Sequence, residues 1–147
     1  MTIDDLLAAW EPTVPSEIRD DPLWQNSAYR LATFAVDFVW DDVTLLAQDS
    51  RTRRLAEQLF SSTGSIGANY AEAYSRSTDK DRCRIYEYSH GSAREARHWI
   101  YASRRIVSQE RTATLLDTMS QILRLLTVTI VRERARNSRL SRRIQQR

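Results

Sequence analysis

Apolar residues recur every three or four positions along four long stretches of this chain. In the first stretch, about 22–47, the recurring apolar positions are Trp24, Ala28, Leu31, Ala35, Phe38 and Leu45. In the second, about 51–75, spacings of 4, 3, 4, 3 and 4 join Leu55, Leu59, Ser62, Ile66, Asn69 and Ala73. This periodicity predicts amphipathic α-helices that pack along a seam, as in a left-handed helical bundle.

Two more helices are predicted downstream. The third, about 79–106, keeps the heptad spacing through Ile85, Ser89, Ser92, Ala96, Trp99, Ser103 and Ile106. The fourth, about 112–135, has a broader apolar arc made of Leu115, Leu116, Met119, Ile122, Leu123, Leu125, Leu126, Val128, Ile130 and Val131. Because a single seam needs a narrower stripe, this arc indicates burial both inside the bundle and against another protein, which predicts an oligomer.

Local signals mark where these helices begin. Asp21 before Pro22 favours a helix start with the aspartate as N-cap. Ser50 is expected to cap the second helix, and Thr78 with Asp81 forms a capping-box pattern before the third.

Residues 1–21 are predicted to form an extension ahead of the bundle. Thr2 can cap a short helix through Trp10, and Pro12 and Pro15 then interrupt it. Apolar side chains in this short helix indicate that it packs on something, for example a neighbouring subunit.

The end of the second helix, 60–76, is rich in small and polar residues. Gly64 and Gly67 each cost about 1 kcal/mol relative to alanine in mid-helix. Since Gly91 lies beside the seam of the third helix, we expect the glycines to let the second and third helices approach closely. A hydrogen-bonded cluster that fixes the register of these two helices is predicted for Asn69, Glu72, Ser92 and Glu95.

The composition fits one soluble, all-α domain. The 147 residues include three Gly, three Pro and a single cysteine, Cys83, which excludes an internal disulfide framework and favours a reducing cytoplasm. The acidic N-terminus lacks a secretory signal pattern, and we expect no stretch of about 20 apolar residues that would span a membrane. We therefore predict a cytoplasmic protein that contacts no membrane.

Charge is distributed unevenly along the chain. Residues 1–50 contain ten acidic residues and two arginines, a net charge of −8, whereas 51–147 contain twenty basic and nine acidic residues, a net charge of +11. All the basic residues except Lys80 are arginine, which suits bidentate contacts with phosphate or carboxylate. Two explanations stay open: anionic partners, or an acidic end of one subunit that meets the basic end of another.

The C-terminal end carries the strongest basic signal. Residues 136–147 are predicted as an arginine-rich tail into which the fourth helix can continue. The chain carries seven arginines from position 132 to Arg147, and the candidate nucleic-acid contacts among them are Arg132, Arg134, Arg136, Arg139, Arg142 and Arg143. Interleaved arginines and aromatic residues on the second and third helices are a further candidate surface for single-stranded nucleic acid, although such aromatics also fit a core or an interface.

No pattern in the sequence indicates catalysis. There is no glycine-rich phosphate loop, nucleophile elbow or Cys-x-x-Cys pair. His90 and His98 are eight residues apart, unlike the i, i+4 histidines of helical zinc sites. We predict neither an enzyme nor a bound metal or cofactor.

Two motifs resemble a known family. They are SIGANYAEA at 65–73 and YSHGSARE at 88–95. With the similar opening of the first helix, they resemble the four-helix bundle proteins encoded by intervening sequences in bacterial 23S rRNA genes. In that family the second helix ends in a pattern of the type S-I-x-x-N-I-A-E-G, from which Tyr70 and Ala73 depart. The resemblance covers roughly residues 22–130.

The resemblance implies an all-α, antiparallel up-down-up-down four-helix bundle with a short N-terminal extension and a basic C-terminal tail. It also implies a homopentamer without established enzymatic activity. Related bundle proteins serve as accessory subunits of diversity-generating retroelements, where they bind nucleic acid and a reverse transcriptase. We therefore expect a non-enzymatic, oligomeric scaffold or adaptor that binds RNA or DNA through arginines, with a reverse transcriptase or another protein as a further candidate partner. The alternative is a purely protein-binding or self-assembling module.

Overall fold

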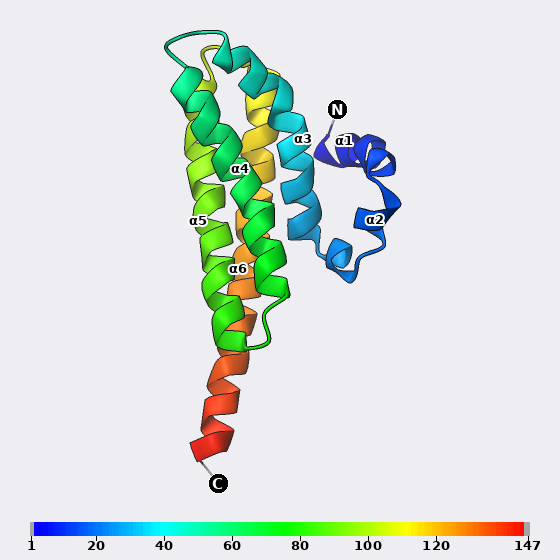
Figure 1. Cartoon of the computed structure of the whole chain (residues 1–147), viewed down its shortest axis with the longest axis vertical. Coiled ribbons are helices and arrows are strands. Elements are labelled where there is room, and N and C mark those ends of the chain that lie inside the picture. Colours follow the sequence, from blue (N-terminus) through cyan, green and yellow to red (C-terminus); the bar gives the residue numbers. More distant parts are fainter. Residues whose placement is uncertain (1, 146–147) are drawn as a thin grey trace.

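The computed structural model describes residues 2–145, and these residues form helices and no strands (Figure 1). Four long helices make up most of the chain: α3 (Ser27–Ala47), α4 (Arg53–Tyr74), α5 (Asp79–Ser103) and α6 (Gln109–Gln145). Helix α3 packs against α4 and α6, and α5 packs against the same two helices, so all four surround one core. Short helical segments precede them: α1 (Ile3–Trp10), η1 (Glu11–Thr13), α2 (Ser16–Arg19) and η2 (Pro22–Gln25).

The core is built largely from the predicted seam positions, but in α5 Ala93 and Ile100 are buried in place of the predicted Ser92 and Trp99. The largest side chains that are almost fully buried include Leu59, Ile66, Ile100, Leu115, Met119, Ile122 and Leu126. Removing each such side chain from water stabilises the fold by about 1.5–3 kcal/mol. Leu45 is an exception to the predicted stripe, since 44 % of its surface is exposed.

Helix α3 begins five residues later than predicted. The Asp21 side chain does accept a hydrogen bond from the Leu23 backbone N–H at 2.8 Å, but the turn that it caps is the 3₁₀ segment η2. Asn26 then adopts an extended backbone, φ −86° and ψ 113°, while its amide donates to the Leu23 carbonyl at 3.0 Å. This asparagine separates η2 from α3.

The start of α4 also differs from the prediction, whereas the start of α5 agrees with it. Thr52 occupies the N-cap position of α4 in place of Ser50, and its hydroxyl donates to the Leu46 carbonyl at 2.7 Å. The Asp49 carboxylate accepts from the Arg51 N–H at 2.9 Å, which prolongs the turn. Thr78 caps α5 as expected by accepting from the backbone N–H of the third helical residue.

The prediction for the glycines is wrong. A Cβ at Gly67 would lie 3.6 Å from the Cβ of Ala32, so this glycine faces α3 and not α5. A Cβ at Gly64 or at Gly91 would meet open space. Helices α4 and α5 are instead joined by the buried Ser89 hydroxyl, which donates to the Ile66 carbonyl at 2.7 Å.

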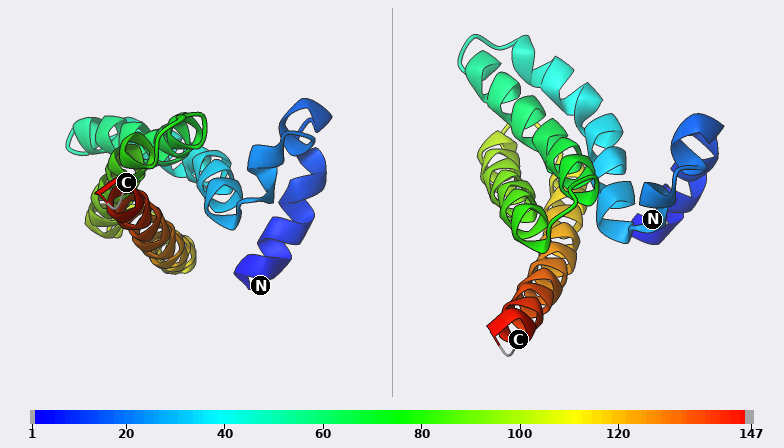
Figure 2. Two further views of the ribbon diagram at one scale, coloured as in Figure 1. Left: turned by 90° about the horizontal axis from the view of Figure 1, so that it is seen from below. Right: turned by 60° about the horizontal axis from the view of Figure 1, so that its bottom comes forward.

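Helix α6 is longer than the predicted range 112–135. It continues without a break through the basic residues 136–145 and projects beyond the other helices (Figure 2); Arg147 lies outside the described residues. By length and composition α6 could also cross a membrane, contrary to our expectation, although 39 % of its most apolar window is buried within the fold.

The N-terminal extension packs on its own chain (Figure 1). Its first helix is capped by Thr2, as predicted. The Trp10 indole donates to the Asp37 carboxylate of α3 at 2.8 Å, and its ring lies 5.4 Å from that of Phe34 in an edge-on arrangement. These contacts fix α1 beside α3.

A buried ion pair fastens α3 to the start of α6. Asp42 is 3 % exposed, and its carboxylate accepts two hydrogen bonds from the Arg111 guanidinium, at 2.6 and 3.1 Å. The same guanidinium lies 4.2 Å from the centre of the Phe38 ring and donates to the Phe38 carbonyl. Because the Asp42 carboxylate is withdrawn from water, its charge depends on the Arg111 guanidinium, which is itself half-buried.

We predict that Asp42→Ala lowers the free energy of unfolding by about 2–3 kcal/mol, since it leaves the Arg111 guanidinium without its carboxylate. Urea unfolding followed by circular dichroism measures this loss. Asp41→Ala, at the exposed neighbouring position, serves as the control and should change stability by less than about 0.5 kcal/mol. Equal effects of the two substitutions would contradict the assignment.

Candidate functional site

A polar pocket lies where α4 ends, α5 begins and α6 leaves the other helices. Its volume is about 460 Å³, which is within the range of small-molecule sites. The residues that line it are Asn26, Tyr70, Tyr74, Arg82, Tyr86, Thr129, Arg132, Glu133 and Arg136. Three of these nine side chains are arginines and one is a carboxylate, so the pocket is positively charged.

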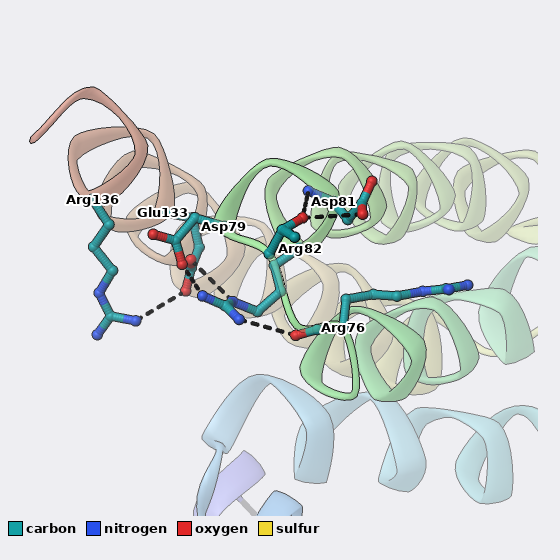
Figure 3. Close-up of polar contacts among 7 residues, drawn as sticks. Arg76, Asp79, Asp81, Arg82, Glu133 and Arg136 are labelled. Atoms are coloured by element: carbon teal, nitrogen blue, oxygen red, sulfur yellow. Dashed lines mark hydrogen bonds and ion pairs between the residues drawn. The ribbon is translucent and has the colours of Figure 1, made fainter. Parts of the chain in front are cut away.

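Arg82 connects three elements on one side of this pocket (Figure 3). Its guanidinium donates to the Arg76 carbonyl after α4 at 2.9 Å, to Asp79 in the first turn of α5, and to Glu133 of α6 at 3.2 Å. Glu133 is only 7 % exposed, so its charge depends on this pairing. Arg136 reaches the same carboxylate at 3.4 Å.

Two tyrosines form the inner part of the pocket. The rings of Tyr70 and Tyr86 lie 4.9 Å apart in an edge-on arrangement, and the Tyr70 hydroxyl donates to the Asn26 side-chain oxygen at 3.2 Å. Burial raises the pKa of Tyr70 and that of Tyr86 above the ordinary value. Both hydroxyls therefore stay protonated at neutral pH and can donate hydrogen bonds.

The basic end of α6 continues outward from this pocket. Spacings of four, three and four place four of the predicted arginines along one face of the helix: Arg132, Arg136, Arg139 and Arg143. We call these four residues the arginine stripe. Arg142 flanks the stripe, while Arg134 lies on the other side and pairs with Glu87 of α5. The stripe extends over about 16 Å of helix.

Repulsion within the arginine stripe destabilises the end of α6 in the isolated chain. All side chains of residues 134–145 are exposed, so apart from the ion pair of Arg134 with Glu87 this part of α6 is not packed into the fold. Arginines four residues apart repel one another by about 0.2–0.5 kcal/mol per pair. An anionic partner along this face would remove that repulsion.

The predicted polar cluster does not form. Glu72 is exposed and pairs with Arg76 on its own helix, and Glu95 accepts a hydrogen bond from the Trp99 indole at 3.3 Å. Within residues 2–145 no hydrogen bond joins Asn69, Glu72, Ser92 and Glu95 to one another. The carboxylates of Glu72 and Glu95 lie on the outer faces of α4 and α5, where each interacts with a residue of its own helix. The sequence signal for the contact that does form was Ser89, a polar residue at a seam position.

Only part of the predicted aromatic surface is accessible. Tyr70 and Tyr86 are buried, whereas Tyr88 and Tyr101 on α5 are 53 % and 55 % exposed. The Arg104 guanidinium lies 3.9 Å from the centre of the Tyr101 ring. This arrangement leaves flat aromatic faces beside arginine on the outer side of α5.

Comparisons with known proteins agree with this fold. The sequence model of the 23S rRNA-intervening sequence protein family matches residues 25–128. A crystal structure of a protein with unknown function from the S23 ribosomal protein family of Bacteroides thetaiotaomicron is similar, with a TM-score of 0.65 and 19 % sequence identity. The similarity covers 70 % of this chain and 97 % of that one. None of the curated proteins matches the sequence.

We predict that Arg82→Met lowers the free energy of unfolding by about 2–3 kcal/mol, because it leaves the buried Glu133 carboxylate with only the 3.4 Å contact to Arg136. The double variant Arg82→Met/Glu133→Leu removes both charges and should return to within about 1 kcal/mol of the original chain. Urea unfolding of both variants checks this. If the double variant lost more than the single one, the unpaired charge would not be the cause.

Proposed function

The chain belongs to the 23S rRNA-intervening sequence protein family, and we propose that it is a non-enzymatic, oligomeric scaffold or adaptor that binds RNA or DNA through arginine-rich surfaces. The proposal places the protein in the cytoplasm. A reverse transcriptase or another protein is a candidate partner of the same assembly.

The proposed scaffold is an antiparallel up-down-up-down four-helix bundle made of α3, α4, α5 and α6. Consecutive helices pack against each other, and α6 also packs against α3, which closes the arrangement. The connections, such as 75–78 between α4 and α5, are short, as between antiparallel neighbours. Such a bundle holds α6 rigidly and presents its basic end to the surroundings.

The arginine stripe is the observation that carries the nucleic-acid proposal. Four guanidinium groups share one face of an exposed helix, so they can contact successive phosphates while their counterions are released. The exposed tyrosines of α5 add a second surface, since bases stack on aromatic rings without regard to sequence. Arg134 links the two surfaces because its ion pair with Glu87 joins α6 to α5.

We predict that replacing Arg139, Arg142 and Arg143 together by alanine weakens binding to labelled structured RNA and single-stranded DNA. The slope of log affinity against log salt should become shallower by about 2 to 3, because each lost phosphate contact removes about 0.7–0.9. Fluorescence anisotropy at several salt concentrations measures the slope.

The matched control for this experiment replaces Arg51, Arg53 and Arg54, three exposed arginines at and just before the start of α4. It removes the same charge at the other end of the molecule and should leave the slope nearly unchanged. Absence of binding at low salt, or binding that does not depend on salt, would exclude nucleic acid as the ligand.

A self-assembling module without nucleic-acid binding is the second candidate function. The observation that favours it is a set of exposed apolar side chains: Trp40, Leu45 and Phe60 on α3 and α4, and Val128 and Val131 on α6. Trp40 is 59 % exposed, and its ring packs edge-on against Phe60 at 5.6 Å. Apolar surface of this kind is usual at contacts between subunits, and a homopentamer is the proposed assembly.

We predict that Trp40→Glu reduces the mass of the particle in solution, because a charge in a subunit contact cannot be buried unpaired. Light scattering at micromolar concentration should give a multiple of 17.1 kDa for the original chain and a lower multiple for the variant. Gln48→Glu adds the same charge just after α3 and should leave the mass unchanged. A monomeric original chain would rule out self-assembly.

A further inference from the structure

We propose that the polar pocket between α4, α5 and α6 binds a nucleoside phosphate, with the phosphate on Arg132 and Arg136 and the base among the tyrosines. The nucleoside phosphate is either a free nucleotide or one unit of an RNA strand. The RNA alternative rests on the proposed function and deepens it, because the pocket would bind the nucleotide at the inner end of the arginine stripe.

The charged side chains of the pocket indicate where the phosphate binds. Arg82 is fully engaged by Asp79, Glu133 and the Arg76 carbonyl, so it is not free to bind a ligand. Arg132, by contrast, forms no ion pair or hydrogen bond within residues 2–145, and Arg136 has only the 3.4 Å contact with Glu133. These two arginines are one helical turn apart and both line the pocket. An anion between them would relieve their repulsion and accept paired N–H donors.

The remaining lining residues suit a planar, hydrogen-bonding ring. Tyr74 lines the pocket and is 43 % exposed, so its ring is available for stacking. The Tyr70 and Tyr86 hydroxyls, the Asn26 amide and Thr129 also line the pocket. Stacking of one base on an aromatic side chain contributes about 1–3 kcal/mol. Tyr70 and Thr129 already donate hydrogen bonds within the fold, but their hydroxyl oxygens can still accept hydrogen bonds from the edge of the base. An inorganic anion would use only the arginines.

The position of the pocket is consistent with a unit of a longer strand. Arg132 and Arg136 belong both to the pocket and to the arginine stripe, which continues through Arg139 and Arg143 along the exposed end of α6. A strand whose phosphates follow the stripe would therefore reach the pocket at its inner end.

Isothermal titration calorimetry at low salt tests the site. The probes are the four ribonucleoside 5′-monophosphates, with inorganic phosphate and adenosine as half-ligands. At least one nucleotide should bind more than about tenfold more tightly than either half-ligand, because only the nucleotide engages both parts of the pocket. Equal affinity for inorganic phosphate and for nucleotides would overturn the proposal.

Thr129→Phe fills the pocket without a change of charge, and Thr127→Phe, the same substitution at an exposed position outside the pocket, is its matched control. Nucleotide affinity should fall at least about tenfold for Thr129→Phe and for Arg132→Ala, and by less than about twofold for Thr127→Phe. Circular dichroism confirms that each variant is folded. Because Arg132 is exposed, the arginine variant tests the site even if Thr129→Phe does not fold. Unchanged nucleotide affinity in a folded pocket variant would overturn the proposal.

A second arm measures an unstructured RNA oligonucleotide with the same variants. If Thr129→Phe weakens the binding of both RNA and nucleotide, the pocket holds a unit of the strand; if it weakens only that of the nucleotide, the ligand is a free nucleotide. Salt-dependent RNA binding without any nucleotide binding would overturn the pocket and leave the proposed function intact. Nucleotide binding without RNA binding would overturn the proposed function and leave the pocket intact.

Discussion

The packing of α4, α5 and α6 at the end of the bundle where α6 leaves it depends on the guanidinium of Arg82. This guanidinium joins the end of α4, the first turn of α5 and the middle of α6, through the Arg76 carbonyl, Asp79 and Glu133. Burying a carboxylate such as that of Glu133 is costly unless a cation meets it directly. Because Arg82 meets that requirement, α6 keeps a fixed position at the point where it leaves the other helices.

One helix can therefore serve three purposes along its length. The first turns of α6 are held by Arg111, its central positions such as Met119 and Leu126 fill the core, and its last turns expose the arginine stripe. Helix formation is costly to start but easy to continue, so a helix that is held at two points can extend into residues that are not buried. Without the anchors, mutual repulsion among the arginines would favour fraying.

The sequence predicts those features that arise from periodicity within one helix. Most of the predicted seam of α4 is buried as expected, because heptad spacing depends only on neighbouring turns. In the second half of α5 the prediction is off by one position, since Ala93 and Ile100 are buried in place of Ser92 and Trp99. The Arg82 network joins residues as far as 51 positions apart, and no local pattern marks such a pairing. The glycines misled the prediction for a similar reason: their spacing does not say which neighbour they face, and Gly67 faces α3.

The departure of Tyr70 from the family pattern connects the fold to the candidate site. An isoleucine at this buried position would need no partner, whereas a phenol hydroxyl must be hydrogen-bonded or it destabilises the protein. Asn26 accepts that bond at 3.2 Å, and it is also the residue whose extended backbone ends η2. The break before α3 thus places the partner that the Tyr70 hydroxyl requires, and both side chains line the pocket. Tyr70 thus adds a polar group to the pocket, and the fold supplies the hydrogen-bond partner for it.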